Sequence, residues 1–213
     1  LGDQAPALAP APVLVFDDRS LGRPFAVQSE AAFLLDEVDA PMLVFRGGRD
    51  FAARATPELR SRYAQRLMRD HARVEYPLWY ELGVSQLASS IFESSKGIIL
   101  GRLIAESRVS VLDWKSSELL STLQRFDLSD LTVPQRARFE AQAWAIAHTL
   151  EFSGAPVSGN NTLLDVYRRA VESRDGAQRE GAFAALGLTP EALEKRIYDH
   201  LERTRPKVRA LEF

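Results

Sequence analysis

Cysteine is absent from this chain of 213 residues, which also has only 2 methionines and 3 histidines. The lack of cysteine excludes disulfides, thiolate metal sites and a cysteine nucleophile. No two of the histidines, His71, His148 and His200, are spaced at i and i+4, so the spacing disfavours a zinc site with three ligands. No apolar run approaches the roughly 18 residues needed to cross a bilayer, and no transmembrane segment is predicted.

An excess of either charge is also absent. The chain has 27 basic and 29 acidic residues, for a formal net charge of -2. This balance gives no reason to expect nucleic acid or an anionic membrane surface as a partner. The 46% hydrophobic and 26% charged fractions are typical of a globular protein.

The first 55 residues contain short apolar runs between turn residues. Residues 1–11 are rich in alanine and proline and predict a flexible lead-in. The runs that follow favour strands because they are short and rich in Val and Phe. They are residues 12–16, 24–28, 31–35 and 41–45. We expect them to form a small antiparallel sheet.

From Thr56 onward the pattern is mostly helical. Thr56 is expected to cap a helix whose first residue is Pro57, and Pro77 starts a second helix. A strand is predicted at 96–103. Further helices are predicted at 115–124, 134–152, 161–173, 178–186 and 190–203.

The expected helix ends depend on particular residues. Asn160 or Asn161 is predicted to cap one helix, Gly187 to close another, and Thr189 with Pro190 to start the last. The predicted fold class is α+β. It consists of one domain over residues 12–213, with a sheet part at 12–55 and a mainly helical part at 56–213.

Three segments carry a resemblance to a known family. They are "YPLWYELGVSQLASS" (76–90), "FEAQAWAIAHTL" (139–150) and "REGAFAALGLTPEALEKRIYDHL" (179–201). In this order, behind a small sheet, they resemble the gluzincin-type zinc metallopeptidase domain. The resemblance implies one helix with an HExxH motif and a second with Trp-x-x-Glu-Gly, which together bind a catalytic zinc ion.

The zinc-binding residues of that family are replaced here. The positions that match HExxH carry Ser61, Arg62 and Gln65, and those of the second motif carry Leu82 and Gln86. None of these side chains is a good zinc ligand, and Arg62 is a permanent cation where a general base is required. The resemblance therefore implies a catalytically inactive pseudo-metallopeptidase that holds no zinc or other cofactor.

The cleft implied by the resemblance would contain Arg62, Trp79, Glu81 and His148. Arg62 could hold a carboxylate there, or pair with Glu81. Trp79 and Trp144 are interpreted as core anchors in preference to cleft walls. His148 is interpreted as a hydrogen-bonded packing residue, and His71 and His200 as surface residues.

Other chemistry finds little support in the residues. His71 with Glu75 and Glu81 is the best rival metal cluster, but Pro77 interrupts any shared helical register. No G-x-S-x-G motif, P-loop or dinucleotide fingerprint is present. The glycine pair of "FRGGRD" (45–50) is better explained as a turn between sheet and helix than as an anion site.

The sequence thus predicts a binding or structural module rather than an enzyme. Its expected partner is a protein or peptide that adds to a sheet edge near Met42–Phe45. The alternative is an active peptidase or hydrolase with a displaced site. The resemblance favours a bacterial cell-envelope or exported protein over a cytoplasmic one, and nothing predicts the oligomeric state.

Overall fold

A computed structural model describes the elements of this chain in two compact units, residues 1–63 and 64–213. The division falls inside helix α1 (Phe51–His71), whereas the sequence placed the change between residues 55 and 56. The structure describes residues 13–16, 32–35, 42–46, 51–71, 74–94, 97–102, 119, 122–125, 127–154, 162–173, 181–202 and 209–212. The predicted lead-in at 1–11 and the predicted strand at 24–28 lie outside these ranges.

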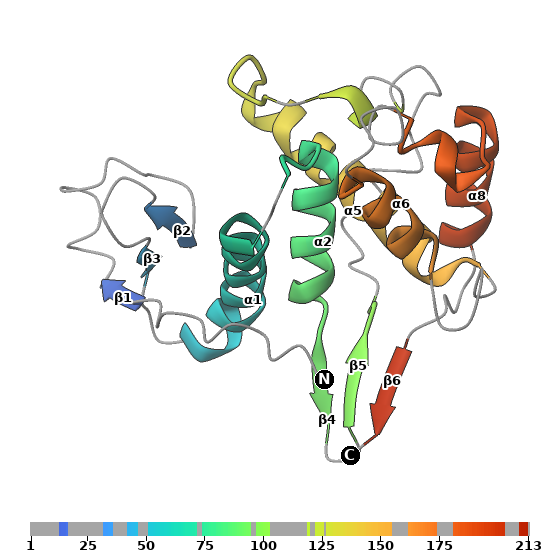
Figure 1. The fold of residues 1–213 in the computed structure, drawn as a ribbon. Helices are drawn as coiled ribbons and strands as arrows, with labels where there is room; N and C mark the ends of the chain where they lie inside the picture. The colour runs from blue at the N-terminus through green and yellow to red at the C-terminus, as the bar shows by residue number, and fades with distance from the viewer. Residues whose placement is uncertain are drawn as a thin grey trace. The chain divides into compact units, whose positions relative to one another are not determined.

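The first unit contains a three-stranded sheet in the order β1-β3-β2 (Figure 1). Its strands are β1 (Val13–Phe16), β2 (Ala32–Leu35) and β3 (Met42–Arg46). β3 pairs in parallel with β1 and antiparallel with β2, so the prediction of an antiparallel sheet is wrong. The apolar runs reveal that strands form, but their side-chain period is the same in both directions of pairing.

The predicted edge strand is also wrong. Met42–Phe45 lies in β3, the central strand, where Leu43 has Val13 as its partner on one side and Leu34 on the other. The backbone groups of a central strand already bond to two neighbours. An added peptide therefore cannot pair with this segment unless β1 or β2 leaves.

Helix α1 begins earlier than the sequence predicts. Thr56 and Pro57 lie inside the helix rather than at its start. The preceding residues include Ala52, Ala53 and Arg54, which have high helix propensity and extend the helix upstream of the proline. Pro57 has no backbone N–H to donate to the carbonyl of residue 53, so the helix lacks that hydrogen bond.

The second unit combines helices with a second sheet. Its described helices, besides the end of α1, are α2 (Leu78–Ser89), α5 (Val133–Phe152), α6 (Leu163–Val171), the short 3₁₀ helix η1 (Ala184–Leu186) and α8 (Pro190–Leu201). Its sheet has the order β4-β5-β6 and is antiparallel throughout. The strands are β4 (Phe92–Ser94), β5 (Gly97–Leu100) and β6 (Arg209–Glu212). Within the described ranges, no helix has both the length and the apolar character required to span a membrane.

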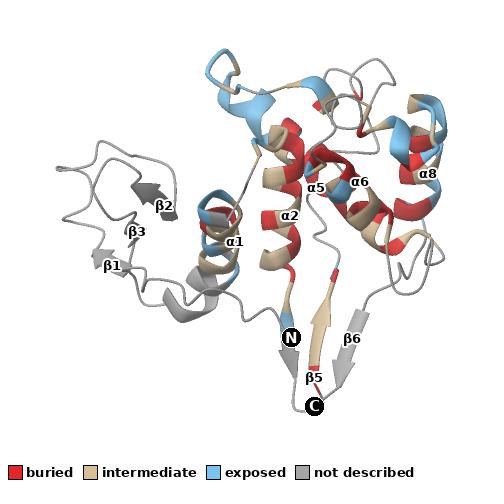
Figure 2. Ribbon diagram, in the orientation of Figure 1, coloured by how far each residue is buried: buried red, intermediate tan, exposed pale blue. Residues whose placement is uncertain are grey.

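The hydrophobic core of the second unit is helical, and α5 is at its centre. Every residue of α5 from Ala141 to Leu150 is buried, and a helix that is buried all round must be covered by neighbours on several sides. Figure 2 shows the other buried residues mainly on α2, α6 and α8. Among the strands, burial is described only for Phe92 of β4 and for β5, and neither contributes a buried hydrophobic side chain.

The predicted α+β class, a small antiparallel sheet followed by one mostly helical domain, is therefore wrong. The part of the chain whose packing is described is mostly helical, and β5 is the one strand whose burial is described throughout. The sequence prediction gave the sheet too large a role because short Val-rich and Phe-rich runs indicate strands without indicating what they cover.

Helices α2 and α5 form the closest contact of the core. A Cβ atom at Gly83 would lie 2.4 Å from the carbonyl oxygen of Ala143 and 2.8 Å from the Cβ of Ala147. Gly83 on α2 thus lets the two helix backbones lie close together, and the facing residues on α5, Ala143 and Ala147, are also small. Trp79, one turn earlier on α2, is fully buried.

Local capping explains where the later helices start. The Thr189 hydroxyl accepts from the N–H of Ala192, and Pro190 follows it, as predicted. Gly187 ends η1 with a φ of 64°, as its predicted role requires. The predicted cap at Asn160 or Asn161 is wrong, because Thr162 caps α6 in a reciprocal box with Asp165.

Replacing Gly83 with alanine tests the α2–α5 contact. We expect Gly83→Ala to lower the free energy of unfolding by about 1–3 kcal/mol, because the added methyl group overpacks the contact despite its better helix propensity. Gly154→Ala is the matched control, since its nearest neighbouring atom would be 3.8 Å away, and we expect a change within about 0.5 kcal/mol. Urea unfolding followed by circular dichroism measures both; equal midpoints for Gly83→Ala and the parent would contradict the contact.

Candidate functional site

The positions that match the zinc-binding residues lie on two helices. Ser61, Arg62 and Gln65 lie on α1, and Leu82 and Gln86 lie on α2. Gln65 is 4% exposed, and Leu82 packs against the hydrophobic core. Ser61 and Arg62 belong to the first unit and the other positions to the second.

Glu81 forms an ion pair with Arg69 rather than standing as an unused carboxylate. The Nε and Nη2 atoms of Arg69 both lie 2.8 Å from Oε1 of Glu81. The Arg69 side chain is about half exposed, so water screens the pair and its contribution to stability is below about 1 kcal/mol. Whether Arg62 holds a carboxylate, or pairs with Glu81 or another acid, stays a prediction.

Glu75 is the only other member of the rival metal cluster whose side chain the structure describes. The side chain of His71 lies outside the described residues, and Glu75 is exposed. Among the residues whose positions are described, no group of three or more His, Cys, Asp or Glu side chains is arranged to hold a metal ion.

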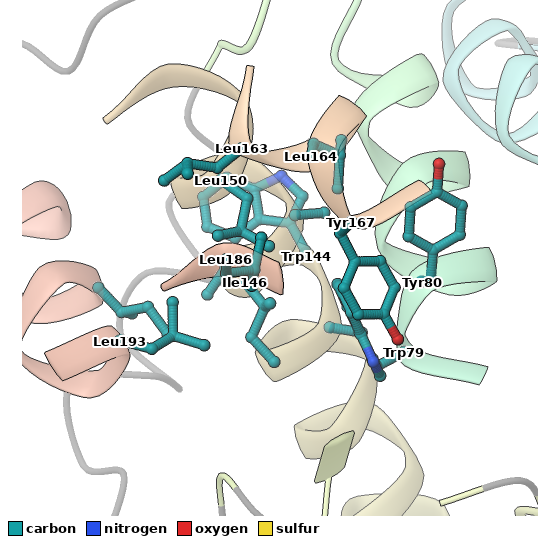
Figure 3. Packing of buried hydrophobic residues seen from close by; sticks show 14 of the residues in the cluster. Trp79, Tyr80, Trp144, Ile146, Leu150, Leu163, Leu164, Tyr167, Leu186 and Leu193 are labelled. Atoms are coloured by element: carbon teal, nitrogen blue, oxygen red, sulfur yellow. The ribbon is translucent and has the colours of Figure 1, made fainter. Parts of the chain in front are cut away.

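Trp79 belongs to an aromatic cluster between α2 and α6. Its ring lies 4.8 Å from that of Tyr167, and Tyr167 lies 5.7 Å from Tyr80. Figure 3 shows these three rings together. Tyr76 stacks on Tyr80 and donates a hydrogen bond to Glu172. Burial raises the pKa of Tyr167 to about 12, so the hydroxyl stays protonated at neutral pH.

Trp144 is also fully buried, which agrees with the interpretation of both tryptophans as core anchors. Its ring lies 4.9 Å from that of His148, further along α5. Trp79 and His148, which the sequence assigned to one cleft, therefore make their described contacts in different clusters.

His148 is a hydrogen-bonded residue of the interior. It is 0% exposed, and its Nε2 lies 2.8 Å from the carbonyl oxygen of Gly101, just beyond β5. Its Nδ1 lies 2.8 Å from Nε2 of His200 on α8. The two histidines and Gly101 thus connect α5, α8 and the end of β5.

The prediction that His200 is a surface residue is wrong, because it is only 1% exposed. The charged residues around it suggested a solvated position. The helical spacing contains the missed signal: Leu193, Ile197, His200 and Leu201 follow the i, i+4, i+7, i+8 pattern of one buried face.

The hydrogen bonds fix which ring nitrogens carry protons. A carbonyl oxygen only accepts, so Nε2 of His148 must donate to Gly101. Burial lowers the pKa of His148 to about 4, and the hydrogen bond to Gly101 opposes this shift. The ring is therefore neutral at pH 7, its Nδ1 accepts, and Nε2 of His200 donates to it.

Gly101 is held from its amide side as well. Its N–H donates to Oγ of Ser90 at 3.2 Å, and that hydroxyl donates to the carbonyl of Leu87 at 2.6 Å. Gly101 has a φ of +90°, and an added Cβ would lie 2.5 Å from the ring of Phe152. Both backbone conformation and space therefore require glycine at this position.

Ser90, Gly101, His148 and His200 form a continuous series of hydrogen bonds, which we call the buried polar chain. Every member is buried. Such a site can share or hold a proton within the interior, but it presents no ring nitrogen to a substrate in water. The sequence identified His148 as a hydrogen-bonded packing residue, but it did not identify the other members of this series.

Removing the hydroxyl of Ser90 tests the buried polar chain. We expect Ser90→Ala to lower the free energy of unfolding by about 1–3 kcal/mol, because it leaves the N–H of Gly101 without an acceptor in the interior. Ser89→Ala is the matched control: the Ser89 hydroxyl also donates to a carbonyl of its own helix, that of Gln86, at 2.7 Å. We expect the control to change stability by less than about 0.5 kcal/mol. Equal losses in the two variants would show that the Gly101 contact contributes nothing.

Comparison with known proteins gives no relative from which a role can be transferred. No family model matches the chain, and no curated protein or solved structure matches it either. The gluzincin-type resemblance therefore stays a prediction from the motifs. What can be said of function rests on the chain's own contacts.

Proposed function

We propose that this protein is a non-catalytic module that binds a protein or an extended peptide, and that the replaced zinc-ligand positions mark an inactive pseudo-metallopeptidase. The observation that supports this most is the engagement of the reactive side chains in structural contacts. The carboxylate of Glu81 is paired with Arg69, and the rings of His148 and His200 bond to each other and to Gly101.

The strand β4 is the best candidate for the binding edge. It pairs with β5 on one side, and no other described strand pairs with it. The unpaired backbone groups of an edge strand are a template for an added strand. Natural proteins usually protect such edges, so an edge strand that also carries an exposed aromatic residue supports a binding role.

An exposed aromatic residue lies at this edge. Phe92 is 46% exposed, an unusual environment for a phenylalanine. The guanidinium of Arg102 lies 5.4 Å from the centre of its ring. A peptide that adds to β4 would gain backbone hydrogen bonds from the strand and apolar contact from Phe92, while Arg102 favours an acidic residue opposite it.

The location in a bacterial cell envelope or outside the cell belongs to the same proposal. It rests on the gluzincin-type resemblance alone. A binding module with an exposed strand edge is compatible with that location, as it is with the cytoplasmic alternative.

A peptide selection tests the proposed edge. Peptides selected from a random 12-residue phage library on the purified protein should bind at micromolar Kd. Phe92→Asp should weaken their binding at least tenfold, because it replaces an apolar contact with a charge. Val133→Asp is the control, since Val133 is 80% exposed on a different element, and it should leave Kd unchanged.

Methylating single backbone amides of a selected peptide tests the mode of binding. In strand addition only alternate amides face the edge, so the loss of affinity should recur at every second residue. Uniform tolerance of methylation, or equal losses in Phe92→Asp and Val133→Asp, would refute β4 as the site. Stoichiometric zinc together with chelator-sensitive cleavage of a fluorogenic peptide would instead establish the peptidase alternative.

A further inference from the structure

The two buried histidines share a contact that limits how many protons they can hold. His148 comes from α5 and His200 from α8, and 2.8 Å separates Nδ1 of the first from Nε2 of the second. A hydrogen bond between these atoms needs one N–H and one lone pair. If both rings were cations, two N–H groups would point at each other.

Nε2 of His148 cannot relieve this limit. It must keep its hydrogen to donate to the carbonyl of Gly101, so any proton added to His148 goes to the nitrogen that faces His200. The folded pair therefore accepts at most one proton beyond its neutral state. In the unfolded chain both rings take up a proton below a pH of about 6.5.

Among the described contacts of His148, none carries an opposite charge. Its described contacts are Trp144 and Phe152 on its own helix, Gly101 beyond β5, and His200. None of them is a carboxylate that would stabilise an imidazolium ion. Burial consequently lowers the pKa of His148 to about 4.

Several charged groups near the pair in sequence have described partners other than the two histidines. On α8, Lys195 and Asp199 form an ion pair at 2.8 Å. On α5, Glu151 accepts from the hydroxyl of Thr162 at 2.8 Å. Next to Gly101, Arg102 lies over the ring of Phe92.

Helix α8 is held on α5 by an apolar face and by this pair. Leu193, Ile197 and Leu201 are buried on the same face as His200. α5 packs much more extensively against α2 than against α8. A weakening of the histidine contact therefore acts on a neighbour that α5 contacts less extensively than it contacts α2.

We propose that His148 and His200 form an acid-sensitive latch that holds α8 against α5 at neutral pH and releases it in acid. This goes beyond the proposed binding function and does not depend on it. The direction follows from proton counting. Because the folded pair binds fewer protons than the opened one, stability present above a pH of about 6.5 is lost as the pH falls toward about 4. For each proton that the opened state binds beyond the folded state, the equilibrium constant for opening rises about tenfold when the pH falls by one unit.

Unfolding measured as a function of pH tests the proton count. The double variant His148→Gln, His200→Gln has no titrating ring at the site, so its unfolding equilibrium constant should rise less steeply toward acid than that of the parent. The difference should approach about tenfold per pH unit near pH 5 and be smaller toward pH 6 and pH 4. His71→Gln, which removes the remaining histidine, is the control and should keep the slope of the parent. Equal slopes in the parent and the double variant would overturn the proposal.

Hydrogen exchange tests which element is released. In the parent protein, lowering the pH from 7 to 5 should speed the exchange of α8 amides more than that of α2 amides, after correction for the intrinsic rate. Release of all helices together would overturn the assignment to α8.

Nitrogen NMR of the imidazole rings keeps the proposal testable if the double variant does not fold. In the parent at pH 7, Nε2 of His148 should carry the proton. The folded pair should take up no more than one proton above pH 4. Two imidazolium rings in the folded protein near pH 5 would overturn the latch.

Discussion

The second unit depends on the close approach of α2 and α5 at Gly83. Because the carbonyl of Ala143 and the methyl group of Ala147 fill the space where a Cβ would be, both helices need small residues where they cross. The large side chains on either side of this contact, including those of Trp79 and Trp144, are fully buried. α5 then becomes a fully buried helix, which α6 and α8 must cover from other directions.

The residues that carry the resemblance to a zinc metallopeptidase are the same residues that make this crossing. Trp79 and Gly83 belong to the segment resembling the second zinc motif, and Ala143, Trp144 and His148 belong to "FEAQAWAIAHTL". Each has a packing or hydrogen-bonding role in the interior. A sequence can therefore keep this apolar pattern through selection for packing alone, while the polar positions between the anchors change freely.

The parts of the fold that sequence could predict are those that local chemistry decides. Thr189 and Pro190 fix a helix start by capping, and the helix predicted at 134–152 is observed as α5 (Val133–Phe152). The sense in which β1 pairs with β3 depends on the path of the whole chain, and its side-chain period carries no such information.

The site was harder to predict because its chemistry is tertiary. His200 looks polar beside Asp199, and only the spacing from Leu193 and Ile197 indicates that it faces inward. The spacing on α8 does not reveal its partner His148 on α5, and it does not reveal Gly101 after β5. Gly101 joins the site through its backbone carbonyl and amide, which every residue possesses, and β4 and β5 start and end beside Ser90 and Gly101. Gly101 thus joins the buried histidines to the base of this hairpin, and both ends of that link are backbone groups that the residue types do not reveal.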